Sequence, residues 1–441
     1  MGHLNLITTE WIPLFVLFFI KIINENKKIN AIYAGFFLLL VTLSSYYYLI
    51  YSSVFILLYI IYHYWSERNS RAQGIVKRIT IMMVSFGIIA LPFLYPLLKE
   101  LLTAKSGYMY GGGFVDMVWY SADLVGFFIP TAFHPLFKGF VSPIYANFTG
   151  NGAENTVFIG YMVLLLSALA LLKSKDKGVK FWAVSALTFF ILSLGPLLHV
   201  NGIVWLHFGI SNLQIPLPLP LPYFILQFIP LFSLARIPSR WVILLMLSLS
   251  ILSGFGLKFI FESLKPKFFH NIDSRSIVTS IVSIIILFEF LAIPYPMGST
   301  KVPIFYQNIG KDPENYALLE FPAIGDAETL YYQTNHGKKL VGGYVSRLSE
   351  DDLKFIRSTP LISQLFNRSP ALLESSNQNL TEKWISALSL QKIKFIILHS
   401  DSLKPDEYNY YNLSLKRILQ ENPTMYHNDN IAVYIIKKNQ T

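Results

Sequence analysis

Cysteine is absent from the 441-residue chain, and charged residues make up only 14% of it. The first absence excludes disulfide bonds and thiolate metal sites. The second separates the chain from soluble domains, in which about 25% of residues are charged. Because 53% of the residues are hydrophobic, the charges are too few to cover a globular surface, and most of the exterior is expected to face lipid.

Signatures of soluble enzymes and of secretion are also missing. The sequence has no HExxH pair, no phosphate-binding loop and no dinucleotide fingerprint. Met1-Gly2-His3 leads directly into LNLITTEWIPLF, without the basic stretch and cleavage site of a secretory signal. The net charge of +10 does not indicate a nucleic-acid partner, because the basic residues lie between apolar runs and form no continuous stripe.

Eight apolar runs are candidates for membrane spans, since a helix needs about 20 residues to cross a hydrocarbon core about 30 Å thick. Residues 31–64 form either a tight hairpin bent at Ser44-Ser45 or one long tilted helix, and the hairpin is favoured because it makes the charges of the connections consistent. With the hairpin, the runs are residues 11–23, 31–45, 46–64, 79–98, 156–172, 181–199, 241–261 and 276–296.

The connections between these runs predict the orientation in the membrane. Lys and Arg gather in cytoplasmic connections, and four basic connections fall on one side: residues 24–30, 65–78, 173–180 and 262–275. The long, aromatic-rich segments 99–155 and 200–240 then lie on the outer side, together with everything after residue 296. IPLPLPLP at 215–222 favours an extended backbone, which is expected at the interface or against protein.

The composition changes after Pro294 and Pro296. Residues 316–322, 394–399 and 431–436 are typical of strands, and residues 381–389 and 405–421 are typical of helices. The sequence therefore predicts an α-helical polytopic membrane protein with about eight spans in residues 1–296. Residues 297–441 are predicted to form a small, soluble, extracytoplasmic α/β domain.

Three residues of the outer segment 99–155 are candidates for catalysis. Asp123 and His134 lie in SADLVGFFIPTAFHP, and Glu154 precedes the next span. A carboxylate or imidazole there could orient sugar hydroxyls or transfer a proton. The alternative, equally supported, is that these residues cap loops and form turns.

Two arginines in LARIPSRW, Arg236 and Arg240, stand at the outer entry of a span. The guanidinium fork suits the phosphate of a lipid carrier, although both side chains could instead snorkel to ordinary headgroups. Phosphate is favoured because these outward arginines break the positive-inside trend. Polar residues that could line a cleft, or serve only as interface and packing residues, are His199, Gln333, His336 and Arg347.

Several stretches resemble a family of polytopic bacterial and archaeal glycosyltransferases of the GT-C type, relatives of the protein O-mannosyltransferases. They are HLNLITTEWIPLF, SADLVGFFIPTAFHP, LSLGPLLHVNG, PLPYFILQFIPLFSLARIPSRW, LLEFP and YYQTNHGKKLVGGYVSR. The resemblance implies transfer of a sugar from a polyprenyl-phosphate carrier on the outer face. In such proteins HLNLI-x-x-EWIPL follows several spans and an acidic catalytic loop. Here it occupies residues 3–14, so the chain is expected to lack its N-terminal part and its general base, and so to be an inactive fragment unless another acid serves.

Two classes of function remain open from the sequence. The first is a multi-pass plasma-membrane glycosyltransferase that takes a polyprenyl-phosphate sugar donor and a glycan or protein acceptor. No cofactor is indicated, and a divalent metal is compatible with the sequence but not required by it. The second is a non-enzymatic transporter of lipid or polysaccharide, or an envelope-assembly factor. Glu289 is the one acid well inside a predicted span. Transporters tend to carry such acids together with paired broken helices in two repeated halves, and no second half matches this span, which favours the transferase fold.

Overall fold

The computed structural model divides the chain into two compact units. The helical unit comprises Gly2–Leu102 and Gly112–Pro296, and the sheet unit comprises Thr103–Gly111 and Met297–Thr441. The segment 103–111, expected within an outer loop, thus belongs to the sheet unit. The structure describes residues 4–25, 27–66, 72–103, 108–109, 113–150, 152, 154–210, 213–229, 232, 235–263, 268–269, 272–295, 300–324, 327–343, 348–374 and 378–436.

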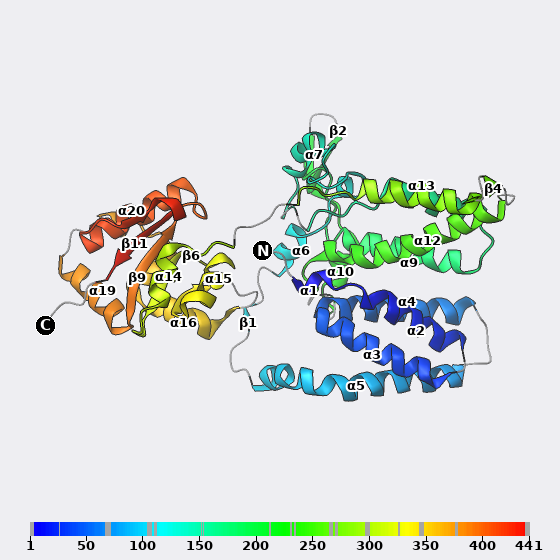
Figure 1. Ribbon diagram of the computed structural model, residues 1–441, viewed down its shortest axis with the longest axis horizontal. Coiled ribbons are helices and arrows are strands. Elements are labelled where there is room, and N and C mark those ends of the chain that lie inside the picture. The colour runs from blue at the N-terminus through cyan, green and yellow to red at the C-terminus, as the bar shows by residue number, and fades with distance from the viewer. Residues whose placement is uncertain are drawn as a thin grey trace. The chain divides into compact units, whose positions relative to one another are not determined.

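Eight helices of the helical unit overlap the eight predicted runs, with ends that differ from the predicted bounds by up to seven residues. They run alternately in opposite directions (Figure 1), and α3 ends at Ser44, Ser45 is extended and α4 begins at Tyr46, which confirms the hairpin. The eight are α2 (Trp11–Asn24), α3 (Lys28–Ser44), α4 (Tyr46–Ser66), α5 (Ala72–Thr103), α8 (Tyr161–Lys173), α9 (Gly178–Ser193), α12 (Val242–Ser263) and α13 (Ser274–Glu289).

Shorter elements complete the helical unit. They are α1 (Leu4–Ile7), α6 (Phe114–Trp119), η1 (Leu124–Phe128), α7 (Lys138–Tyr145), α10 (Tyr223–Leu226), η2 (Pro238–Trp241) and two hairpins, β2 (Trp205–Ile210) with β3 (Leu213–Pro218) and β4 (Phe268–Phe269) with β5 (Ile272–Asp273). The Pro-rich stretch is extended, as predicted, and forms part of β3.

Three segments among the described residues are long and apolar enough to cross a membrane: Tyr46–Trp65, Gly74–Pro96 and Pro238–Ser263. The other apolar helices are shorter. At 1.5 Å per residue, the 14 residues of α2 extend only about 21 Å, less than a hydrocarbon core of about 30 Å.

The ends of the eight helices define two ends of the helical unit. At the turn end, α2, α4, α8 and α12 finish and α3, α5, α9 and α13 begin; the opposite end, where the long segments leave, is called the loop end (Figure 1). The turn end carries the basic residues Lys27, Lys28, Lys77, Lys173, Lys175, Lys177, Lys180 and Arg275. Arg78 is buried there and donates from Nε to Ile22 O at 2.7 Å, which satisfies a carbonyl at the end of α2.

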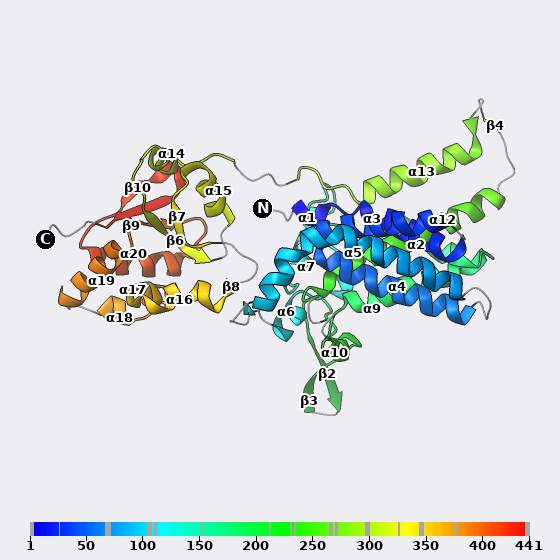
Figure 2. The same cartoon turned by 90° about the horizontal axis from the view of Figure 1, so that it is seen from below.

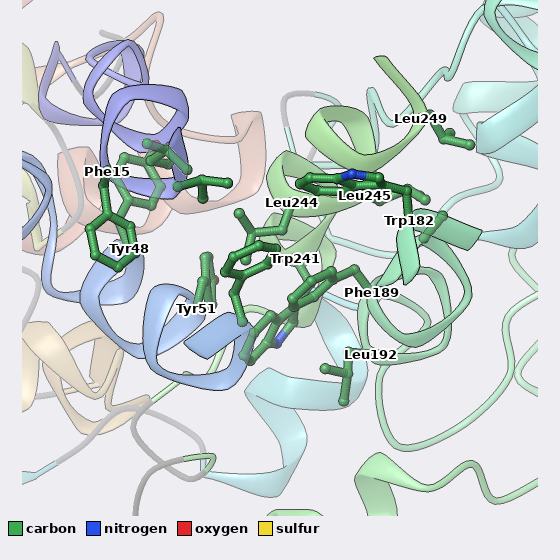
Figure 3. Packing of buried hydrophobic residues seen from close by; sticks show 14 of the residues in the cluster. Phe15, Tyr48, Tyr51, Trp182, Phe189, Leu192, Trp241, Leu244, Leu245 and Leu249 are labelled. Carbon is green, nitrogen blue, oxygen red and sulfur yellow. The ribbon is translucent and has the colours of Figure 1, made fainter. Parts of the chain in front are cut away.

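Aromatic packing and close helix crossings hold the helical unit together. Trp241 is fully buried, with its ring centroid 4.1 Å from that of Tyr51 and 5.9 Å from that of Phe189 (Figure 3). A Cβ on Gly256 would lie 2.0 Å from Leu166 O, so α12 and α8 approach as closely as their backbones allow. Hydroxyl groups add contacts between the helices: Ser185 Oγ lies 2.8 Å from Ser248 Oγ.

The sheet unit is a three-layer α/β/α sandwich (Figure 2). Its five-stranded sheet has the order β10-β11-β9-β6-β7, in which β6 is parallel to β7 and to β9 and the remaining pairs are antiparallel. The strands are β6 (Ala317–Ile324), β7 (Lys339–Gly343), β9 (Ile393–His399), β10 (Thr424–Tyr426) and β11 (Ile431–Ile435), and the short pair β1 (Tyr108–Met109) and β8 (Leu348–Ser349) is separate.

Alternation along the strands directs side chains to the two helical layers. Leu318 of β6 packs with α14 (Ile304–Gly310) and the neighbouring α15 (Ala327–His336), whereas Leu319 and Phe321 pack on the opposite face. The second face is covered by α16 (Glu350–Ser358), α17 (Pro360–Phe366), α18 (Ala371–Glu374), α19 (Gln378–Leu390) and α20 (Pro405–Leu419), and η3 (His427–Asp429) links β10 to β11.

Candidate functional site

The most buried ion pair at the loop end joins Arg240 to Glu154. Arg240 lies in the single turn η2, which Pro238 begins, and Glu154 lies in the segment before α8. Arg240 Nη2 lies 2.5 Å from Glu154 Oε1, and Nε lies 3.1 Å from Oε2. The side chains are only 10% and 15% exposed, so the pair is held in a medium of lower dielectric than water.

The guanidinium of Arg240 also contacts an aromatic ring, and one of its edges lies outside the ion pair. Its Cζ lies 5.1 Å from the ring centroid of Tyr47 in α4, which is a cation–π distance. Glu154 accepts from Nε and Nη2, and among the described residues no hydrogen bond from Nη1 is found. One edge of the fork therefore remains outside the pair with Glu154.

Arg236 forms a looser pair. Its Nη1 lies 3.5 Å from Asp116 Oδ2 of α6, and the side chains are 24% and 23% exposed. Arg236 precedes η2, so the two arginines do not share a face of α12. Each of them instead meets a carboxylate from a different part of the segment 99–155, a partner that the sequence does not identify.

Asp123 fixes the backbone of two loops. Its carboxylate accepts hydrogen bonds from the backbone N–H groups of Val125 at 2.9 Å, Asn201 at 2.9 Å and Gly202 at 2.7 Å, and its side chain is buried. Asn201 and Gly202 have φ of 50° and 78°, a conformation in which successive N–H groups converge on an anion. These contacts favour capping over catalysis for Asp123.

His199 lies beside Asp123 and is completely buried. Its Nδ1 is 3.0 Å from Thr149 Oγ1. Burial lowers the pKa of His199, and the nearby Asp123 carboxylate opposes part of that decrease. The imidazole is therefore neutral at pH 7 and serves the contact between these loops.

His134 and Glu289 connect α13 to the loop end. His134 Nδ1 accepts from the backbone N–H groups of Leu136 and Phe137 at 3.2 and 3.3 Å, so Nε2 carries the proton and donates to Phe288 O at 2.9 Å. The Glu289 oxygens accept from the backbone N–H of Met162 at 3.1 and 3.2 Å, at the start of α8. Turn formation and helix capping account for both side chains.

The residues proposed to line a cleft from the C-terminal part make contacts within the sheet unit. Gln333 Nε2 donates to Lys338 O at 3.0 Å, and His336 Nδ1 accepts from the backbone N–H of Lys338 at 3.0 Å. Burial, and to a lesser degree the charge of Lys338, lower the pKa of His336 to about 4. Arg347 lies outside the described residues.

A buried polar cluster in the sheet unit was not anticipated from the sequence. Glu320 Oε2 accepts from Tyr306 O–H at 3.0 Å and lies 3.1 Å from His399 Nε2, and all three side chains are buried. The available signal was a carboxylate between Leu319 and Phe321 in an apolar strand run. Such a position requires buried partners.

No group of three or more His, Asp or Glu residues that could hold a metal ion is found in the described part of the chain. In comparisons with known proteins, no family model matches the chain, and no curated protein matches it either. The geometry of the loop end is thus the basis for assigning a function.

Proposed function

We propose that this chain is a multi-pass membrane glycosyltransferase of the GT-C type that takes its sugar from a polyprenyl-phosphate donor at the loop end. The observation that carries the proposal is the pair of outward arginines, of which Arg240 is desolvated and oriented by Glu154 while its Nη1 edge stays outside that pair. A guanidinium held this way can bind phosphate at low reorganisation cost.

The charge distribution supports an orientation for this protein in the plasma membrane. Basic residues gather at the turn end, in each of the four connections between the helices, which accords with a cytoplasmic location. The loop end and the sheet unit are then extracytoplasmic, and all eight helices cross the bilayer, the short ones with local thinning. Reporter fusions at residues 175 and 320 should give opposite locations; equal signals would exclude this topology.

In the proposed reaction, the donor phosphate binds Arg236 and Arg240, and an acceptor hydroxyl of a glycan or protein attacks the anomeric carbon of the sugar. The hydroxyl loses its proton to a base, and polyprenyl phosphate leaves with the electron pair of the broken C–O bond. Of the three candidates from the segment 99–155, Asp123 and His134 are held by contacts with backbone groups, which leaves Glu154 as the candidate for that base.

The direct test measures binding of a polyprenyl-phosphate hexose to the full-length protein in phosphatidylcholine nanodiscs. A charged hydrogen bond contributes about 1.5–3 kcal/mol, so Arg236→Ala should weaken binding at least about tenfold. Arg236→Lys should restore it only in part, because lysine lacks the planar fork. Arg275→Ala removes an exposed arginine from the turn end and is the matched control.

Two results would contradict the proposal. Equal affinities for wild type, Arg236→Ala and Arg275→Ala, with all three folded, would show that the outward arginines only anchor the protein among headgroups. Donor binding without transfer of a radiolabelled sugar to an isolated envelope fraction would retain the donor site but reject the transferase activity, in favour of a carrier for the lipid.

A further inference from the structure

The sheet unit carries a polar groove on the side of the sheet covered by α14 and α15. Its volume is about 560 Å³, and it is lined by Lys301, Val302, Gln307, Gly310, Lys311 and Asn335. That volume is within the range of small-ligand sites. Two of the lining residues are lysines, and no carboxylate is among the lining residues in the described part of the sheet unit.

Nearby acidic residues are held by other cations. Asp312 and Glu314 follow Lys311 in the sequence, and their carboxylates lie 3.1 and 2.6 Å from Lys394 Nζ. The backbone carbonyls of both residues also accept hydrogen bonds from Lys338 Nζ. The carboxylates of Asp312 and Glu314 therefore pair with Lys394 and not with Lys311. Lys311 has no ion-pair partner within the described residues.

The remaining lining groups are suited to hydroxyl groups. Gln307 donates its Nε2 hydrogen to Val302 O at 2.8 Å, which holds the amide in place and leaves its oxygen as an acceptor. Asn335 is exposed at the end of α15 and supplies both a donor and an acceptor. Gly310 allows α14 to approach α15 closely, since a Cβ there would lie 3.1 Å from Asn335 O.

We infer that this groove binds an anionic saccharide, with Lys301 and Lys311 on its carboxylate or phosphate groups and Gln307 and Asn335 on its hydroxyls. Among the described residues, the lining contains no aromatic ring on which a sugar face could stack and no guanidinium fork. Binding is therefore charge-driven and falls with rising salt, since exposed charges are screened over about 8 Å at 0.15 M. If the groove binds the acceptor of the transfer reaction, that acceptor is an acidic glycan, and this assignment rests on the proposed function. Binding of an anionic saccharide to the groove does not depend on the proposed function.

The test is equilibrium binding of tetragalacturonate to the full-length protein in phosphatidylcholine nanodiscs, measured by microscale thermophoresis. Lys311→Glu should weaken binding at least about tenfold, because it replaces one cation by an anion in the groove. Lys383→Glu makes the same change of charge at an exposed position of α19 and should leave the affinity within about twofold. Maltotetraose, the neutral comparison, should bind at least about tenfold more weakly than tetragalacturonate.

Three outcomes would overturn the inference. Equal losses in Lys311→Glu and Lys383→Glu would show that net charge, not the groove, governs binding. Equal affinity for maltotetraose would exclude recognition of the anionic group. Inorganic phosphate that binds as tightly as the tetrasaccharide would show a simple ion site without a saccharide subsite. The binding assay needs no turnover. If the protein transfers no sugar but still binds tetragalacturonate through Lys311, the assignment of the groove stands and only the transferase function is rejected.

Discussion

Removing Glu154 should destabilise the helical unit more than removing any other carboxylate paired with an arginine at the loop end. Glu154→Ala leaves the guanidinium of Arg240 without a counter-ion at a site where the side chain is only 10% exposed. Breaking a buried ion pair costs about 3–5 kcal/mol, and the partial exposure places this pair at the lower limit, about 3 kcal/mol. For domains of this size 1 kcal/mol shifts Tm by about 2–4 °C, so Tm should fall by at least about 6 °C.

The assay is thermal unfolding of purified protein in detergent, and the chain supplies its own control. Asp116→Ala breaks the chemically similar pair with Arg236, which is 23–24% exposed and separated by 3.5 Å; it should cost about 1 kcal/mol or less. The double variant Glu154→Ala/Arg240→Ala should lose less than the sum of the two single losses. Equal shifts for Glu154→Ala and Asp116→Ala, or strict additivity in the double variant, would refute the assignment of a desolvated pair.

Three further predictions address the interpretation of the loops, a helix crossing and the sheet unit. Asp123→Ala should cost about 2–4 kcal/mol, because three backbone N–H groups lose their acceptor; a folded Asp123→Ala protein with unchanged Tm but no transfer would instead make Asp123 catalytic. Gly256→Ala should lower Tm because its Cβ would lie 2.0 Å from Leu166 O, whereas Gly254→Ala, with nothing within 4 Å, should be neutral or slightly stabilising, and equal effects would count against close packing of α12 on α8. The pKa of His336 is lowered to about 4 from its ordinary 6.5, so between these pH values the unfolded chain binds more protons than the folded protein. The contribution of neutral, buried His336 to the free energy of unfolding is therefore present above pH 6.5 and lost as the pH falls toward 4. The urea midpoint of wild type should therefore fall more steeply over that range than that of His336→Gln, and parallel curves would show that His336 is not buried in the folded protein.

The sequence was sufficient to locate the main elements, because long apolar runs and alternating strands depend on local composition. The runs 11–23 and 46–64 correspond to α2 and α4, and residues 394–399 correspond to β9. The short strand β7, with two glycines, was missed because it lacks the alternating apolar pattern that marks a strand.

The partners of the site residues could not be predicted in the same way. Glu154 and Arg240 are 86 residues apart, and no local pattern specifies such a pairing. The sequence supports two interpretations of Asp123 and His134, catalysis or the capping of loops and turns. The decisive facts, backbone donors from residue 201 and a carbonyl acceptor at residue 288, depend on how distant loops meet in space.

The carboxylate of Asp123 also places a constraint on biosynthesis. Its donors on Asn201 and Gly202 follow 78 and 79 residues later in the chain, and at about 5–20 residues per second they are made about 4–16 s after Asp123. Both α8 and α9 are synthesised in that interval. Until this helical hairpin has formed, the carboxylate of Asp123 can be hydrogen-bonded by water but not by its final backbone donors. Any change that delays the α8–α9 hairpin prolongs that interval, during which the unfinished loop end is open to proteases and quality-control factors.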